Sequence, residues 1–177
     1  MPNNSFVPLS VAVLTISDTR TEDNDTSGRY LCTAVTSYGH HLCEKTIVVD
    51  DKNRIIETLQ SWIQNPKIDV VLTTGGTGLT HRDVTPEALE AVVEKRIPGF
   101  GELFRYLSYQ KIGLSTIQSR ACAGSANGTL IFALPGSTGA CKDAWNGILK
   151  AQLDIRSKPC NFAEILPRMK DLGFARK

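Results

Sequence analysis

Several features that mark specialised classes of protein are missing from this sequence of 177 residues. Its five cysteines never occur as C-x-x-C, so they indicate reduced core thiols rather than a zinc site or a disulfide framework. Its three histidines offer no metal-binding cluster. No apolar stretch approaches the length that crosses a bilayer, and residues 1–5 lack the charged and apolar regions of a secretory signal. The sequence therefore predicts a cytoplasmic protein with no membrane partner.

Charge of one sign is not concentrated anywhere in the chain. The formal net charge is +2 and there is no basic run, so no nucleic-acid partner is expected. Hydrophobic residues make up 41% and charged residues 21%, values near the globular average that argue against disorder. A chain of this length fits one domain, residues 1–177, with a substantial core.

Strand-like apolar runs alternate with helix-like patterns. Runs typical of buried parallel strands occupy residues 10–17, 68–72 and 129–134, and a less hydrophobic run at 41–49 is expected nearer a sheet edge. Helices are expected at residues 26–38, 52–64, 85–93, 101–111 and 141–153. This alternation predicts an α/β fold, a three-layer α/β/α sandwich with a mostly parallel central sheet.

Turn and cap residues punctuate the pattern. Asp25 opens the first helix and Gly39 ends it, as glycine often does. Pro98-Gly99 is expected to separate two helices, and Asn127-Gly128 is typical of a hairpin turn.

The strongest functional signal follows the run at 68–72. Gly75, Gly76 and Gly78 stand at the carboxyl end of that strand, where backbone without side chains lets N–H groups approach a ligand. The residue between them, Thr77, belongs to the same loop. An anion-ready backbone at such a place favours phosphate binding.

The loop continues into a helix with chemically useful residues. Arg82 is followed by Asp83, a carboxylate able to hold Mg²⁺, and then by a helix start in which Thr85 is expected to cap and Pro86 to occupy the first turn. Arg82 fits a phosphate contact and an ion pair with a neighbouring carboxylate equally well.

The loop differs from better-known phosphate loops. No Gly-Lys-Ser/Thr follows the glycines, so it is not a P-loop, and His81 stands where a dinucleotide fingerprint needs its third glycine. The triplet His81-Arg82-Asp83 lacks the downstream Asn of a kinase catalytic loop. A tight strand-to-helix turn in which Asp83 merely caps remains the alternative to a phosphate site.

Polar residues also follow the other predicted strands. They are Ser17-Asp18, Asp50-Asp51 and Gly136-Ser137. Because ligands of open α/β sheets bind beyond the carboxyl ends of the strands, we expect these segments to share a crevice with the glycine loop. Asp51 fits an N-cap for the helix at 52–64, whereas Asp50 stands where a ligand-facing carboxylate would lie.

Five segments in order resemble one known family, the molybdopterin-binding family of molybdenum cofactor biosynthesis, MoaB/MogA. They are Thr15-Ile16-Ser17-Asp18, Gly75–Ala88, Pro98-Gly99-Phe100-Gly101-Glu102, Ser119-Arg120-Ala121 with Ala123-Gly124, and Leu134-Pro135-Gly136. The resemblance covers about residues 9–162, leaving 163–177 as a C-terminal extension, and is greatest to the MoaB branch.

The resemblance implies a reaction and its ligands. Active family members are molybdopterin adenylyltransferases, which transfer AMP from Mg·ATP to molybdopterin and release pyrophosphate. By position, Asp50 and Asp83 match the carboxylates assigned to catalysis and to Mg²⁺. The residues that match the binding crevice are Ser17, Asp18, Gly75, Gly76, Thr77, Gly78, Ser108, Pro135, Gly136 and Ser137.

Other readings remain open at this point. Some members of the MoaB branch lack the carboxylate at the position of Asp50, so a non-catalytic molybdopterin-binding or carrier protein is one alternative, although this chain retains Asp50. An unrelated phosphate-binding regulatory module is another. Family members form trimers, sometimes paired into hexamers, and the apolar positions of residues 100–107 fit an interface or the core.

Overall fold

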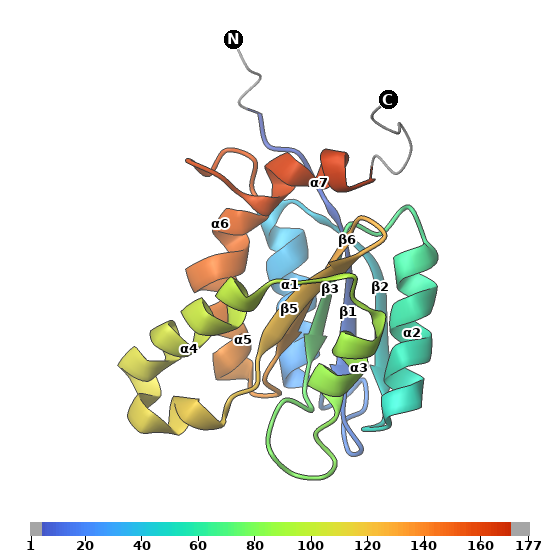
Figure 1. Ribbon diagram of the computed structural model, residues 1–177, viewed down its shortest axis with the longest axis vertical. Coiled ribbons are helices and arrows are strands. Elements are labelled where there is room, and N and C mark those ends of the chain that lie inside the picture. The colour runs from blue at the N-terminus through green and yellow to red at the C-terminus, as the bar shows by residue number, and fades with distance from the viewer. Residues whose placement is uncertain (1–4, 171–177) are drawn as a thin grey trace.

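The computed structural model describes residues 5–170, which form a six-stranded sheet covered by helices on both faces (Figure 1). The strand order is β2-β1-β3-β6-β5-β4. The strands are β1 (Ser10–Ile16), β2 (His41–Val48), β3 (Val70–Thr74), β4 (Lys95–Arg96), β5 (Cys122–Ala126) and β6 (Thr129–Leu134). Strands β2, β1, β3 and β6 are parallel, β5 pairs antiparallel with β6, and β4 pairs antiparallel with β5. The predicted α/β sandwich with a mostly parallel sheet is confirmed.

Helices connect the parallel strands. They are α1 (Thr26–Tyr38), α2 (Lys52–Gln64), α3 (Thr85–Val92), α4 (Pro98–Ile112), the 3₁₀ helix η1 (Gly113–Gln118), α5 (Thr138–Ala144), the π-helical turn η2 (Trp145–Leu149), α6 (Lys150–Gln152) and α7 (Phe162–Lys170). No helix within residues 5–170 combines the length and the apolar character needed to cross a membrane.

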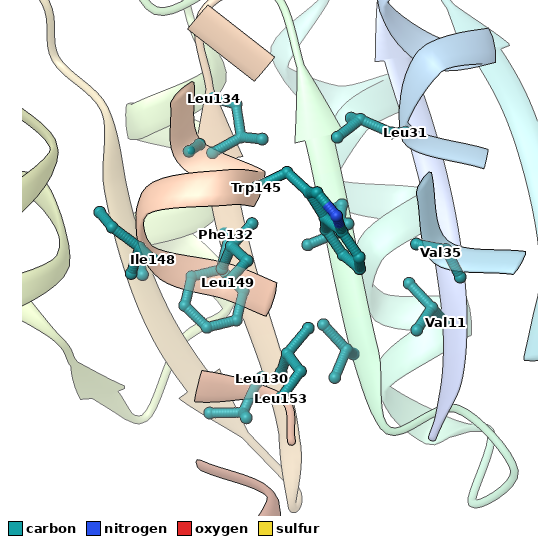
Figure 2. Close-up of a cluster of buried hydrophobic side chains, with 14 of the residues drawn as sticks. Val11, Leu31, Val35, Leu130, Phe132, Leu134, Trp145, Ile148, Leu149 and Leu153 are labelled. Carbon is teal, nitrogen blue, oxygen red and sulfur yellow. The ribbon is translucent and has the colours of Figure 1, made fainter. Parts of the chain in front are cut away.

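Each face of the sheet has its own core. Alternate residues of β1 point to opposite faces, so Val11 and Val13 pack with α1, α4, α5 and α7, whereas Ala12 and Leu14 pack with α2 and α3. Figure 2 shows the first core, where side chains of α1, β1 and β6 meet those of η2 and its neighbours. Burial on both faces explains why β1 is almost wholly apolar.

The predicted ends of α1 and α2 are confirmed. Asp25 accepts a hydrogen bond from the Gly28 N–H at 2.9 Å, and Gly39 closes α1 with φ +106°. Asp51 caps α2 by accepting from the Arg54 N–H at 3.0 Å. Each cap acts on backbone groups within a few residues of it, so the sequence alone predicts where the helix ends lie.

The predicted cap at Thr85 is wrong. Thr85 is the first residue of α3, which begins after Val84 without a side-chain cap. Its fully buried hydroxyl instead donates to the Gly75 carbonyl at 2.8 Å. A buried carbonyl at the glycine turn needs a donor, and Thr85 supplies it across ten residues. Pro86 occupies the first turn as predicted.

Two further predictions required correction. Pro98-Gly99 does not precede α4 but begins it, because the fixed φ and missing N–H of proline suit a first helical turn. The helix expected at 141–153 starts earlier, at Thr138, and contains the π turn η2.

The hairpin turn at Asn127-Gly128 is confirmed, with both residues at positive φ. The extension contributes α7, while residues 171–177 of that prediction lie outside the described residues.

His40, the residue before β2, is a buried histidine. His40 is 3% exposed, and its Nδ1 accepts a hydrogen bond from the Leu9 N–H at 3.1 Å. Nε2 therefore carries the proton, and within residues 5–170 it has no hydrogen-bond partner. The rings of Phe6, Tyr38 and Trp145 surround the imidazole. Burial lowers the pKa of His40 below its ordinary value of 6.5.

We expect the free energy of unfolding to fall as the pH drops below 6.5, because the unfolded chain then protonates His40 while the folded chain resists. The loss reaches at most about 1.4 kcal/mol per pH unit. Urea titrations at several pH values between 7 and 5 measure it. The variant His40→Gln should show a shallower dependence, and equal slopes for the two proteins would contradict the assignment.

Candidate functional site

The carboxyl ends of β1, β2, β3 and β6 meet at one edge of the sheet, as the sequence predicted. Main-chain hydrogen bonds join them there: Ser17 N–H donates to the Val48 carbonyl at 2.8 Å, and Gly75 N–H to the Leu134 carbonyl at 3.0 Å. In Figure 1 this edge is at the bottom, where the loop between β3 and α3 projects. Helices α1, α2, α3 and α5 all begin at this edge, so their positive ends face it.

The glycine loop makes approaches that no side chain would allow. Gly75 has φ +110°, and a Cβ there would overlap the backbone carbonyl oxygen of Ile16. Gly76 has φ +65°, and a Cβ there would overlap the Thr85 hydroxyl and lie 3.2 Å from Asp50 Oδ1. The Asp50 carboxylate therefore lies directly beside the bare backbone of the loop.

Asp50 is coupled to Asp18 by a reciprocal pair of hydrogen bonds. The Asp18 N–H donates to Asp50 Oδ2 at 3.0 Å, and the Asp50 N–H donates to Asp18 Oδ1 at 3.1 Å. This exchange joins the loops after β1 and β2. Burial, followed by the charge of Asp18, raises the pKa of Asp50 above its ordinary value.

Arg82 forms an ion pair with the carboxylate of Asp18. Of the two roles expected for this arginine, a phosphate contact and an ion pair, the structure shows the ion pair. Its guanidinium donates Nε to Oδ2 at 2.9 Å and Nη2 to Oδ1 at 2.8 Å. This hydrogen bonding lowers the pKa of Asp18. The pair is exposed and joins the loops after β1 and β3 over a sequence distance of 64 residues.

Asp83 lies beside Gly78, two residues further along the glycine loop than Gly76. Its Oδ2 accepts from the Thr80 N–H at 2.9 Å and from the Thr80 hydroxyl at 2.6 Å, and a Cβ at Gly78 would lie 2.9 Å from it. Burial opposes its ionisation, but donors from Thr80 and Gly78 outweigh burial and lower its pKa. The charge of Asp83 in turn helps to raise the pKa of Asp50. The two carboxylates thus lie beside the same short loop.

The remaining predicted residues divide into two groups. Ser17, Pro135, Gly136 and Ser137 lie at the strand ends: Ser17 Oγ accepts from the N–H groups of the following turn, and Ser137 caps α5. A Cβ at Gly136 would lie 3.3 Å from the Gly75 Cα. Ser108, by contrast, is buried in the second half of α4. The hydrogen bonds that join the strand-end residues within 5–170 do not include it.

Arg120 is the site residue whose role the sequence did not predict. Its guanidinium donates to the carbonyls of Gly78 and Asp83, each at 2.7 Å, and pairs with Glu87. Its own N–H donates to the Thr77 carbonyl at 3.1 Å. Its place in the segment Ser119-Arg120-Ala121 was the only available signal, and that segment does not say which loop the side chain reaches.

The arrangement combines glycine backbone, helix N-termini and carboxylates, which are groups that suit a phosphorylated ligand with a divalent cation. Within residues 5–170, no three His, Cys, Asp or Glu side chains gather in a way that could hold a metal ion by themselves.

Comparisons with known proteins agree with this fold. The family described as "probable molybdopterin binding domain" matches residues 12–154. The molybdenum cofactor biosynthesis protein B of Escherichia coli (strain K12) is 50% identical over 160 residues, which cover 90% of this chain and 94% of that protein.

Solved structures agree as well. The crystal structure of a molybdenum cofactor biosynthesis protein B superposes with a TM-score of 0.84 at 40% identity, covering 92% of this chain and 96% of the other. The tungsten cofactor synthesizing protein MoaB from Pyrococcus furiosus superposes with a TM-score of 0.76 at 32% identity, covering 92% and 98%. The chain therefore belongs to the MoaB/MogA family of molybdopterin-binding domains. Its role lies in molybdenum cofactor biosynthesis.

Proposed function

We propose that the protein is a molybdopterin adenylyltransferase, which transfers AMP from Mg·ATP to molybdopterin and releases pyrophosphate. The observation that supports this most is the placement of Asp50 beside Gly76 and of Asp83 beside Gly78 in the same loop. Phosphoryl and nucleotidyl transfer depend mainly on positioning and on neutralising charge. A glycine loop with two carboxylates beside it offers both.

The residues present fit a magnesium ion. Asp50 Oδ1 faces Gly76, and Asp83 presents its carboxylate beside Gly78, so both would supply the hard oxygen ligands that Mg²⁺ prefers, with substrate oxygens completing the set. When bound, the ion would neutralise charge on the transferred phosphoryl group.

The other residues have binding roles in the proposal. N–H groups of Gly76 and Thr77 hold phosphate oxygens, because those of Gly75 and Gly78 already donate to the Leu134 carbonyl and the Asp83 carboxylate. Ser17, Asp18, Pro135, Gly136 and Ser137, at the strand ends, contact the pterin and the nucleotide, whereas Ser108, buried in α4, has no binding role in the proposal. No nucleic-acid or membrane partner belongs to this proposal, and the cytoplasmic location predicted from the sequence is part of it.

Pyrophosphate release tests the proposal against its alternative. Purified protein incubated with ATP, Mg²⁺ and molybdopterin should release pyrophosphate and form adenylylated pterin. Protein that binds molybdopterin in a fluorescence titration without releasing pyrophosphate would instead be a carrier of the same pathway. Protein that binds no pterin at all would be a phosphate-binding module of another kind.

Self-association is the second part of the proposal, as a homotrimer or a hexamer. Helix α4 and η1 carry an exposed apolar patch, which we call the α4–η1 patch; it consists of Leu103, Tyr106, Tyr109, Ile112, Leu114 and Ile117. The last two are 80% and 83% exposed. Monomers seldom leave so many large apolar side chains together in water, so the patch supports an interface between copies.

Charged side chains in the α4–η1 patch should separate the subunits. We expect the double variant Leu114→Glu, Ile117→Glu to have the mass of one 19.3 kDa chain in light scattering at micromolar concentration. The matched control Val7→Glu changes an exposed apolar residue outside the patch and should keep the mass of the unchanged protein. If the unchanged protein already has the mass of one chain, the measurement contradicts this part of the proposal.

A further inference from the structure

Arg120, which is not at a strand end of the candidate site, makes hydrogen bonds to the glycine loop. Arg120 lies between η1 and β5, and its guanidinium reaches carbonyls at two separate points of the loop, Gly78 and Asp83. Its main-chain N–H reaches a third, that of Thr77. Its pairing with Glu87 extends the contact to α3. A single residue thus connects both ends of the loop to the helix that follows.

These contacts determine which way the loop's N–H groups point. In a planar trans peptide the C=O and the next N–H point in opposite directions. Carbonyls of Thr77, Gly78 and Asp83 that turn toward Arg120 therefore turn the following N–H groups away from it. The N–H of Gly78 accordingly serves the Asp83 carboxylate, whose pKa it helps to lower. Arg120 thus holds the loop in the conformation in which the Gly78 N–H supports the Asp83 carboxylate.

Arg120 is itself held in place by α4. The Arg105 guanidinium donates to the Ala121 carbonyl at 2.9 Å and to the Ser119 carbonyl at 3.4 Å, which are the residues on either side of Arg120. A Cβ at Gly101 would lie 2.5 Å from the same Ala121 carbonyl, so α4 packs closely against this segment. The backbone that carries Arg120 is therefore anchored independently of the loop.

We propose that Arg120 is a positioning residue, whose guanidinium fixes the Gly75–Asp83 loop in the conformation that accepts phosphate; this rests on the phosphate-binding role proposed for the loop. The planar fork of arginine serves Gly78, Asp83 and Glu87 in three directions at once. A lysine ammonium at one point could not reach all three with the same geometry. The ordinary alternative is an exposed ion pair with Glu87 that contributes little.

Three variants separate these roles: Arg120→Lys, Arg120→Gln and Glu87→Gln. Hydrogen exchange of the amides in residues 75–84 reports the loop directly and needs no substrate. We expect both Arg120 variants to exchange there about tenfold faster or more, while the amides of β1 and β3 keep their protection. Glu87→Gln, which removes only the outer ion pair, should exchange like the unchanged protein. Slow exchange in Arg120→Lys would overturn the proposal.

Kinetics then test the positioning role. We expect both Arg120 variants to raise the KM for ATP and lower kcat for AMP transfer by about tenfold or more, without recovery in Arg120→Lys. A merely structural role would reduce the amount of active protein and leave KM unchanged, which would overturn the proposal. Normal kinetics despite faster exchange would overturn it too. If the unchanged protein transfers no AMP, the proposed function fails, and the exchange data with the Kd of Mg·ATP still decide the role of Arg120.

Discussion

Replacing Asp50 with asparagine is expected to lower the rate of AMP transfer by about 10²-fold or more, which corresponds to ~2.7 kcal/mol of transition-state stabilisation. The substitution removes the negative charge that faces Gly76 but keeps an oxygen that can accept the Asp18 N–H. The fold should therefore survive while the proposed Mg²⁺ ligand is lost. Pyrophosphate release under saturating Mg·ATP measures the effect.

The neighbouring residue provides a matched control. Asp51→Asn makes the same chemical change one position along, at the cap of α2, and asparagine caps as well as aspartate does. We expect its turnover to match that of the unchanged protein. Asp83→Asn should retain pterin binding and lose transfer to a similar extent as Asp50→Asn. Normal turnover by either catalytic variant would refute its assigned role.

The second large effect concerns stability. Gly75→Ala should lower the free energy of unfolding by about 3 kcal/mol or more. The residue has φ +110°, and the added Cβ would overlap the Ile16 carbonyl oxygen. That oxygen belongs to the backbone of β1, which is paired with β2 and β3 on either side, so it has little freedom to move. Urea unfolding at a fixed protein concentration measures the loss.

Gly99→Ala is a matched control that shows whether the loss of stability is specific to position 75. Gly99 lies in the first turn of α4, and a Cβ there would meet nothing within 4 Å. Gly99→Ala should leave stability unchanged or raise it by up to about 1 kcal/mol, because alanine favours helix more than glycine does. A loss from Gly75→Ala no larger than the change from Gly99→Ala would show that the loop is not strained as described.

Local signals account for what the sequence predicted correctly about the fold. Asp25, Gly39 and Asp51 act on backbone within a few residues, so their positions predict helix ends. Strand β5 was not predicted, because its sequence of small residues, CAGSA, has no strand-like apolar pattern. It pairs with β6 because the hairpin at Asn127-Gly128 returns the chain alongside that buried strand.

The candidate site likewise has a part that the sequence predicts and a part that it does not. Glycines, carboxylates and caps at strand ends indicate where a crevice lies, since parallel strands end at one edge. Contacts between loops could not be predicted in this way, because they depend on which strands are neighbours in the sheet. The pairing of Arg82 with Asp18 spans 64 residues, and the bond from Arg120 to Gly78 spans 42. Neither partner carries a mark in the sequence that singles out the other.

The last turn of α7 bears on how this protein can be handled. Lys170 donates to the Pro66 carbonyl and to Asp69, just ahead of β3, and Asp69 also accepts from the N–H of Ser10, where β1 begins. The described chain thus starts and stops at the top of Figure 1, a strand's length, on the order of 20 Å, from the loops at the bottom. A label attached at either end of the described residues would therefore lie at the opposite end of the sheet from the strand-end loops and leave those loops free for titration.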